Sequence, residues 1–156
     1  MDALYPLTLF YDGQCAVCSL EMDHLRERNH DGRLVFVDIA SEGFDPTAFG
    51  ATRAEMDALI HGLRADGTML RGVEVLRLAY EAVGLGALWQ PTRWGPLRPL
   101  ADAGYRAFAR HRRTISRVAA PLIAAIRTAR AARTAARMRA CASGQCDIRD
   151  IPRRHS

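Results

Sequence analysis

Two cysteines three positions apart, Cys15 and Cys18, are the residues of this 156-residue chain best suited to chemistry. They follow Asp12 in the segment Tyr11-Asp12-Gly13-Gln14-Cys15-Ala16-Val17-Cys18, where an apolar run gives way to a helical pattern. A thiol at the first turn of a helix faces unpaired backbone N–H groups and the positive end of the helix dipole, and both stabilise a thiolate. Because the thiolate is the nucleophile in disulfide exchange, this position predicts a reactive pair.

The order of the two cysteines along the helix predicts different roles for them. Cys15, nearer the helix N-terminus, is predicted to be the nucleophile, and Cys18, one turn deeper on the same face, the resolving thiol. The helix dipole is expected to lower the pKa of Cys15 from its usual value of about 8.5. Asp12, if ionised nearby, acts against this because a like charge disfavours the thiolate. Asp12 has two other candidate roles, as a proton acceptor for Cys18 and as a cap of the helix.

A second cysteine pair, Cys141 and Cys146, leaves several interpretations open. Because C-x-x-C pairs also occur in zinc sites, the four thiolates together could hold a metal ion. The second pair could instead form its own disulfide, relay electrons to Cys15 and Cys18, or consist of two unrelated thiols. Dithiol exchange needs no organic cofactor, so none is predicted.

The elements that must position the dithiol follow from the apolar pattern. Residues 7–11 and 34–39 read as buried strands on either side of a helix from about 15 to 29, which predicts parallel pairing with a right-handed crossover. The capping-box pattern of residues 52–55 begins a short second helix. Residues 59–63 and 68–70 flank Asp66-Gly67, a pattern typical of a hairpin.

A third helix is expected between Gly72 and Gly84, so the order is β-α-β-α-β-β-α. This order predicts an α/β, thioredoxin-like fold with a C-terminal helical extension. We expect a redox domain over residues 1–90, a closing helical segment packed on it over 91–120, and an Arg/Ala-rich helix and tail over 121–156.

The charge of the chain is unevenly distributed. All 22 basic residues are arginines, and the net charge is +5. Residues 1–102 carry nine arginines and fifteen acidic residues, whereas residues 103–156 carry thirteen arginines and two acidic residues. Such asymmetry predicts that the basic tail contacts something acidic, with the acidic N-terminal part of the chain, a membrane surface and nucleic acid as the candidates. No aromatic residues interleave the arginines between Arg127 and Arg139, so base stacking is unsupported there and nucleic acid is not an expected partner.

The sequence also predicts a compartment. The first residues, Met1-Asp2-Ala3-Leu4-Tyr5-Pro6, lack the basic start and apolar run of a secretory signal. No stretch approaches the roughly 18–20 apolar residues of a membrane span. We therefore expect a cytoplasmic protein without a membrane span, in which a C-x-x-C pair is more often catalytic or metal-binding than structural.

The Asp-x-x-Cys-x-x-Cys motif of Asp12, Cys15 and Cys18 resembles the one for which the DCC family of predicted thiol–disulfide oxidoreductases is named. The resemblance covers residues 5 to about 118, and it includes Phe36-Val37-Asp38, Asp66-Gly67, Gly72-Val73-Glu74 and the segment 105–112. It implies a thioredoxin-like fold in which Cys15 and Cys18 cycle between dithiol and disulfide. A protein or a low-molecular-weight disulfide or thiol is then the expected substrate.

One departure from thioredoxins in general concerns the substrate groove. Thioredoxins place a cis-proline opposite the dithiol, but this chain has no proline between Pro46 and Pro91. Either another residue closes the groove or partners bind differently. The leading hypothesis is a thiol–disulfide oxidoreductase. The alternatives are a non-catalytic thioredoxin-like binding module with a basic tail and a protein that binds metal through cysteines.

Overall fold

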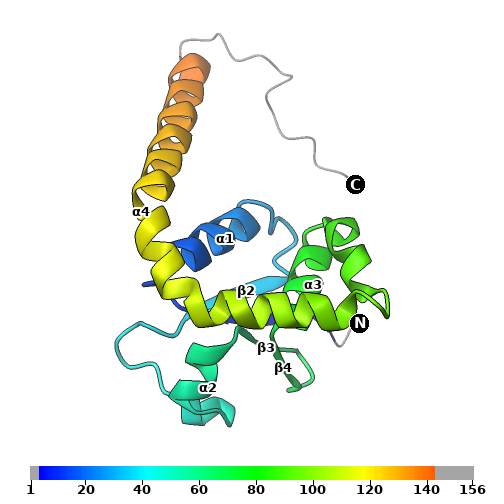
Figure 1. Ribbon diagram of the computed structural model, residues 1–156. Helices are drawn as coiled ribbons and strands as arrows, with labels where there is room; N and C mark the ends of the chain where they lie inside the picture. Colours follow the sequence, from blue (N-terminus) through cyan, green and yellow to red (C-terminus); the bar gives the residue numbers. More distant parts are fainter. Residues whose placement is uncertain (1–3, 143–156) are drawn as a thin grey trace. The chain divides into compact units, whose positions relative to one another are not determined.

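A computed structural model describes residues 4–142 of the chain, with side chains through residue 140 (Figure 1). The predictions for the side chain of Cys141 and for Cys146 therefore lie outside the described residues. The contacts divide the chain after Ala119 into two compact units. The first unit carries the sheet and both cysteines of the C-x-x-C motif, and the described part of the second is a stretch of helix that ends at residue 142.

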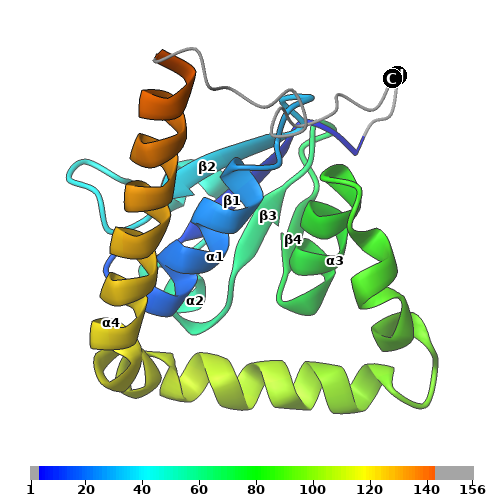
Figure 2. The same ribbon diagram turned by 90° about the horizontal axis from the view of Figure 1, so that it is seen from above.

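The described residues form a four-stranded sheet in the order β2-β1-β3-β4 (Figure 2). Its strands are β1 (Leu7–Tyr11), β2 (Leu34–Asp38), β3 (His61–Leu63) and β4 (Met69–Arg71). Strand β1 pairs in parallel with β2 and antiparallel with β3, and β3 and β4 form an antiparallel hairpin. Both the parallel pair and the hairpin were expected from the sequence, and both are confirmed.

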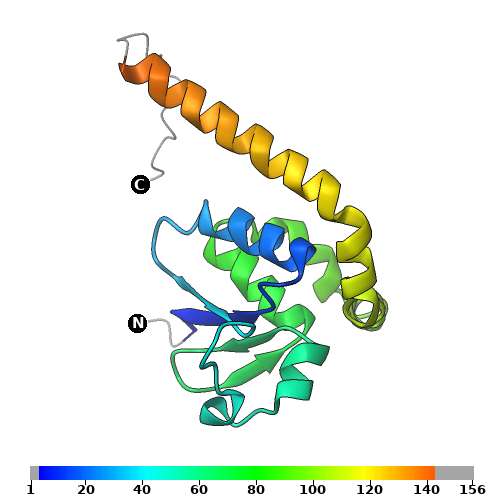
Figure 3. The ribbon, with the colours of Figure 1, turned by 90° about the vertical axis from the view of Figure 1, so that its left-hand side faces the viewer.

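Helices cover both faces of this sheet. Helices α1 (Ala16–Arg26) and α3 (Val73–Ala82) lie on one face, and α2 (Arg53–Ala58) lies on the other (Figure 3). Because side chains alternate along a strand, Leu7 and Leu9 of β1 join the cluster under α1 and α3, whereas Phe10 joins a cluster with Met56 of α2. The predicted order β-α-β-α-β-β-α and the thioredoxin-like α/β class are thus confirmed.

Two local features show how the helix ends are fixed. The capping box expected at residues 52–55 is present, with the Thr52 side chain and the Glu55 side chain each accepting from the other's backbone N–H. Helix α1 ends at Arg26, earlier than the expected end near Asn29. The side-chain amide of Asn29 instead bonds both backbone groups of Leu34 at 2.8 and 3.0 Å, which ties the connection to the start of β2.

Three further helices complete the described chain. The 3-10 helices η1 (Pro46–Phe49) and η2 (Gly86–Arg93) lie in connections, and α4 (Arg98–Ala142) follows η2. Pro121 lies inside helix α4. Within residues 4–142, no helix is both long enough and apolar enough to span a bilayer.

Gly62 of β3 has no room for a side chain. A Cβ atom there would lie 2.8 Å from Cγ1 of Val75 and 3.3 Å from Cδ1 of Leu7, both inside the core. We expect Gly62→Ala to lower the free energy of unfolding by about 1–3 kcal/mol because core overpacking forces neighbouring atoms to shift. Urea denaturation followed by circular dichroism measures this, with Gly95→Ala, whose Cβ meets nothing within 4 Å, as the matched control. Equal midpoints for the two variants would contradict the close packing of α3 on β3.

Candidate active site

Cys15 and Cys18 are joined by a disulfide at the N-terminus of α1. Cys15 is the N-cap residue of the helix, and its Sγ accepts a hydrogen bond from the backbone N–H of Cys18 at 3.3 Å. A sulfur in this position replaces the side-chain oxygen of an ordinary cap, so the first turn of the helix offers it an N–H donor. In the reduced protein, the same donor would stabilise a Cys15 thiolate.

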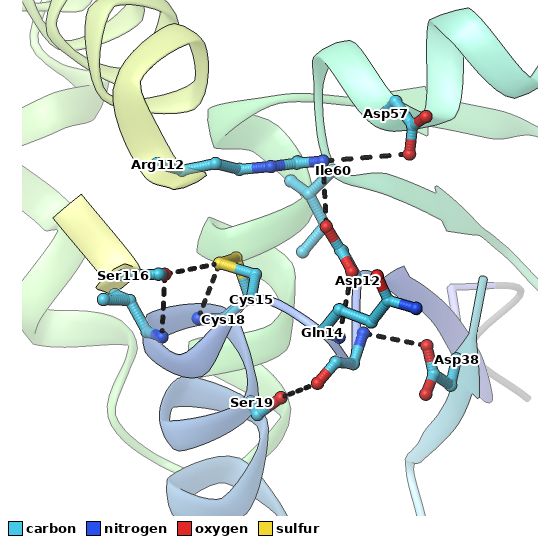
Figure 4. Close-up of a disulfide and its surroundings, with 12 residues drawn as sticks. Asp12, Gln14, Cys15, Cys18, Ser19, Asp38, Asp57, Ile60, Arg112 and Ser116 are labelled. Carbon is cyan, nitrogen blue, oxygen red and sulfur yellow. Dashed lines mark hydrogen bonds and ion pairs between the residues drawn. A yellow bond between two sulfur atoms is a disulfide. The ribbon is translucent and has the colours of Figure 1, made fainter. Parts of the chain in front are cut away.

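The loop that leads into the dithiol is held by two carboxylates. The Asp12 side chain accepts from the backbone N–H of Gln14 at 3.0 Å, and the Asp38 side chain accepts from that of Gly13 at 2.8 Å (Figure 4). A Cβ at Gly13 would overlap a carboxylate oxygen of Asp38, so only glycine allows this approach. The Ser19 hydroxyl donates to the carbonyl of Gly13 at 2.9 Å. These bonds fix the position of the cysteines relative to the ends of β1 and β2.

Ser116 of α4 contacts Cys15 and the first turn of α1. Its Oγ lies 3.2 Å from the Cys15 Sγ and accepts a hydrogen bond from the backbone N–H of Val17 at 3.3 Å (Figure 4). Ser116 and Cys15 are both buried. The Val17 N–H donates to the Ser116 oxygen and leaves the hydroxyl proton free to donate to another acceptor. The sulfur of Cys15 is the acceptor within reach. The hydroxyl is therefore a second donor for a thiolate at Cys15.

We expect Ser116→Ala to make the Cys15 thiolate harder to form. A hydrogen bond to a charged group contributes about 1.5–3 kcal/mol, and alanine removes it. In reduced Cys18→Ala protein that also carries Cys141→Ser/Cys146→Ser, the 240-nm absorbance of the Cys15 thiolate should therefore rise at higher pH in Ser116→Ala than in the parent. Ser116→Thr keeps the hydroxyl and serves as the control. If alanine and threonine give the same pH profile, the hydroxyl does not act on the sulfur.

A buried ion pair links the loop before the dithiol to α4. The guanidinium of Arg112 lies 3.5 Å from the carboxylate of Asp12, and the two side chains are 8% and 7% exposed. The same Arg112 nitrogen lies 3.9 Å from Asp57 of α2 (Figure 4). The carboxylate of Asp12 therefore pairs with Arg112 and Gln14, and it does not cap α1, whose N-cap is Cys15. One arginine thus joins the loop after β1, α2 and α4 beside the disulfide.

The two cysteines differ in their access to solvent. Cys15 is 2% exposed, whereas Cys18 is partly exposed. Cys18 also lines a cavity of about 530 Å³ within the first unit, and Cys15 does not. The walls of this cavity are mostly apolar and include Phe10, Met22, Leu76 and Phe108. A small reactant in the cavity would meet Cys18 first, so accessibility favours the cysteine that the sequence predicted to be the resolving one.

Tyr105 of α4 closes the cavity beside the start of β3. Its hydroxyl accepts a hydrogen bond from the backbone N–H of Ile60 at 2.9 Å, and both residues line the cavity. Burial raises the pKa of Tyr105, so the hydroxyl remains protonated at neutral pH. Within residues 4–142 the cis peptide is Tyr5–Pro6, which precedes β1 and lies at the other end of that strand from the dithiol. The Tyr105 hydroxyl thus pairs with the backbone N–H that directly precedes β3, beside the cavity.

The structure brings together the three residues that the sequence singled out and adds two that it did not. Asp12, Cys15 and Cys18 lie together at the end of β1 and the start of α1. Ser116 and Arg112 were not selected as site residues because they lie about a hundred positions away along the chain. The segment 105–112 had carried part of the family resemblance, which was the one signal that pointed to Arg112.

A metal site is not formed by the described residues. Within residues 4–142, no three or more His, Cys, Asp or Glu side chains gather in an arrangement that could hold a metal ion. The metal alternative depended on Cys141 and Cys146, which lie beyond the side chains described.

Comparison with known proteins agrees with this site. Residues 9–118 match the family of DCC1-like thiol-disulfide oxidoreductases, a span that includes the disulfide, Arg112 and Ser116. A protein of Arabidopsis thaliana, described as uncharacterized and chloroplastic, is 36% identical over 128 residues. That alignment covers 81% of this chain and 59% of the plant protein, so the chain spans about three-fifths of its relative's length. No solved structure matches the chain. With its C-x-x-C disulfide at the start of α1, the chain belongs to the DCC1-like thiol-disulfide oxidoreductase family.

Proposed function

We propose that the protein is a thiol–disulfide oxidoreductase that exchanges with its substrate through a mixed disulfide at Cys18. The observation that carries the proposal is the asymmetry of the disulfide. Cys18 lines the 530 Å³ cavity, and Cys15 is buried against donors from Cys18 and Ser116. The rate of exchange depends on access to the attacked sulfur and on the stability of the thiolate that leaves. Cys18 has the access, and Cys15 has the donors that a leaving thiolate needs.

The reaction of the oxidised protein then has two steps. A substrate thiolate attacks the sulfur of Cys18, a bond forms between them, and the Cys15–Cys18 bond breaks with its electron pair on Cys15. A second substrate thiolate attacks the substrate sulfur of the mixed disulfide and releases Cys18 as a thiolate. The substrate thiols are oxidised to a disulfide by two electrons, and the protein is reduced to the dithiol. In the opposite direction, Cys18 attacks a substrate disulfide and Cys15 resolves the product.

Asp12 is a positioning residue in this scheme. Its carboxylate holds the loop through Gln14 and holds α4 through Arg112. Since α4 carries Ser116, the ion pair keeps the hydroxyl donor at the sulfur of Cys15. The proton-acceptor role of Asp12 toward Cys18, expected from the sequence, stays a prediction.

The experiment is turnover of a disulfide substrate by purified protein in the Cys141→Ser/Cys146→Ser background, which leaves one cysteine pair. Reduction of insulin or of a small aromatic disulfide, with dithiothreitol as the electron source, should proceed faster than the uncatalysed reaction. Cys15→Ser and Cys18→Ser should each reduce steady-state turnover to the uncatalysed rate, because the cycle needs both sulfurs. Turnover that persists in either variant would overturn the proposal.

Two further predictions of the sequence stay predictions. Cytoplasmic location is one, and the plant relative is described as chloroplastic. The other is contact between the basic C-terminal helix and an acidic partner, which the exposed positions of Arg133 and Arg137 on α4 support. Salt-sensitive association that is lost when residues 121–156 are deleted would favour the binding-module alternative if the same protein shows no exchange activity.

A further inference from the structure

The cavity at Cys18 adjoins a groove lined with arginines. The groove is formed by α2 and α4 in the first unit, and Arg106, Arg110 and Arg113 line it. Ala109 and Arg112 line both the groove and the cavity, so the two hollows meet at these residues. Arg106, Arg110 and Arg113 are exposed, and they follow one another at helical spacing along the same face of α4.

The charges on this groove are not balanced. Asp57 is the acidic residue of its lining, and it already lies within 4 Å of Arg112 and Arg113. Among the side chains of residues 4–140, neither Arg106 nor Arg110 forms an ion pair with a carboxylate. An arginine presents a planar fork of donors that matches a carboxylate. The groove is therefore suited to an anionic group.

The cavity itself suits an apolar body. Its volume of about 530 Å³ lies within the range of small-molecule sites. Two carboxylates also line it, but each is engaged: Glu21 accepts from the hydroxyl of Tyr80, and Asp12 pairs with Arg112. A negative group is disfavoured next to Glu21 and favoured where the cavity meets the groove at Arg112.

We infer that the substrate is a low-molecular-weight disulfide or thiol with an apolar body and a carboxylate. The body would occupy the cavity against Cys18, and the carboxylate would lie in the groove near Arg106 and Arg110. This inference rests on the proposed function and specifies its substrate class. In the reduced protein, the Cys18 thiolate attacks one sulfur of the compound and releases the other half as a thiolate. Cys15 then attacks the Cys18 sulfur, releases the second half and restores the protein disulfide, so two electrons pass to the compound.

Three aromatic or aliphatic disulfides test the substrate class in the Cys141→Ser/Cys146→Ser background. They are 5,5′-dithiobis(2-nitrobenzoate), which is aromatic and anionic, 4,4′-dithiodipyridine, which is aromatic and uncharged, and cystamine, which is aliphatic and cationic. Each rate constant with reduced protein is divided by that with a short cysteine peptide, which removes the intrinsic reactivity of the compound. We expect the normalised rate to be highest for the aromatic acid, by on the order of tenfold over the uncharged compound at low salt.

Two variants separate the roles of groove and cavity. Arg106→Glu/Arg110→Glu should remove the preference for the aromatic acid and leave the uncharged compound unaffected. The matched control, Arg133→Glu/Arg137→Glu, makes the same charge change in the second unit and should alter neither rate. Gly104→Leu places a side chain at a cavity-lining position of α4 where a Cβ meets nothing within 4 Å, and it should slow both aromatic compounds.

The outcomes distinguish this inference from the proposed function. Exchange with all three compounds at equal normalised rates, or an equal effect of the two double charge reversals, would overturn the substrate class while leaving the exchange chemistry intact. Absence of reaction between the cysteine pair and any of the three compounds would overturn the proposed function itself.

Discussion

Cys15→Ser protein is expected to stop at a stable mixed disulfide with its substrate, whereas Cys18→Ser protein is expected to form that adduct far more slowly. In Cys15→Ser, the remaining thiol lines the cavity and the resolving thiol is missing. In Cys18→Ser, the remaining cysteine is a residue with 2% exposure, and its sulfur lies against Ser116. If local opening of α4 costs about 2–3 kcal/mol, the rate of adduct formation through Cys15 falls by on the order of 10²-fold.

The adduct is measured by intact-protein mass spectrometry over time with one aromatic disulfide, in the Cys141→Ser/Cys146→Ser background. The same two variants unfolded in urea provide the control, because the sulfurs should then react at similar rates. If folded Cys18→Ser forms the mixed disulfide faster than folded Cys15→Ser, the proposal is wrong. Cys15 would then be the nucleophile toward substrate, as the sequence predicted.

Arg112→Met is expected to destabilise the oxidised protein by about 3–5 kcal/mol. Methionine fills a similar volume but leaves the carboxylate of Asp12 buried without its ion-pair partner, and an uncompensated buried charge is costly. The free energy of unfolding from urea denaturation measures the effect. Arg53→Met is the matched control, because Arg53 also lies 3.9 Å from Asp57 but is half exposed, and exposed pairs contribute about 0–1 kcal/mol.

A second variant separates the ion pair from packing. Asp12→Leu/Arg112→Met removes both charges and should recover much of the stability that Arg112→Met loses. If the free energy of unfolding of the single variant Arg112→Met lies within about 1 kcal/mol of the parent's, the ion pair does not stabilise the contact between the dithiol loop and α4.

Features encoded by neighbouring residues were predictable from the sequence. The capping box of Thr52 and Glu55, the hairpin around Asp66-Gly67 and the helix that begins at the dithiol all depend on residues within a few positions of one another. The parallel pairing of β1 and β2 followed from the apolar strands on either side of that helix. The α/β class followed from the order of these elements.

Contacts between distant segments were not predictable in the same way. The bond between Ser116 and Cys15 joins residues 101 positions apart, and no local pattern marks that serine. The sequence placed Cys15 at the helix N-terminus but gave no sign that α4 buries its sulfur and leaves Cys18 beside a cavity. The stabilisation of a Cys15 thiolate could be inferred from its position at a helix N-terminus. The solvent accessibility of Cys15 and Cys18 could not, because it depends on how α4 packs against α1.

The most direct test is a redox titration of the Cys15–Cys18 pair. Cys141→Ser/Cys146→Ser protein is equilibrated in glutathione or dithiothreitol buffers of graded potential, alkylated, and analysed by mass spectrometry. We predict one reversible two-electron transition between a form with two alkyl groups and a form with none, with a tenfold change in the equilibrium constant for each 29.6 mV, as expected for a two-electron couple. Protein that carries two alkyl groups at every potential, or a single group over a wide range, would contradict a dithiol–disulfide couple at this site.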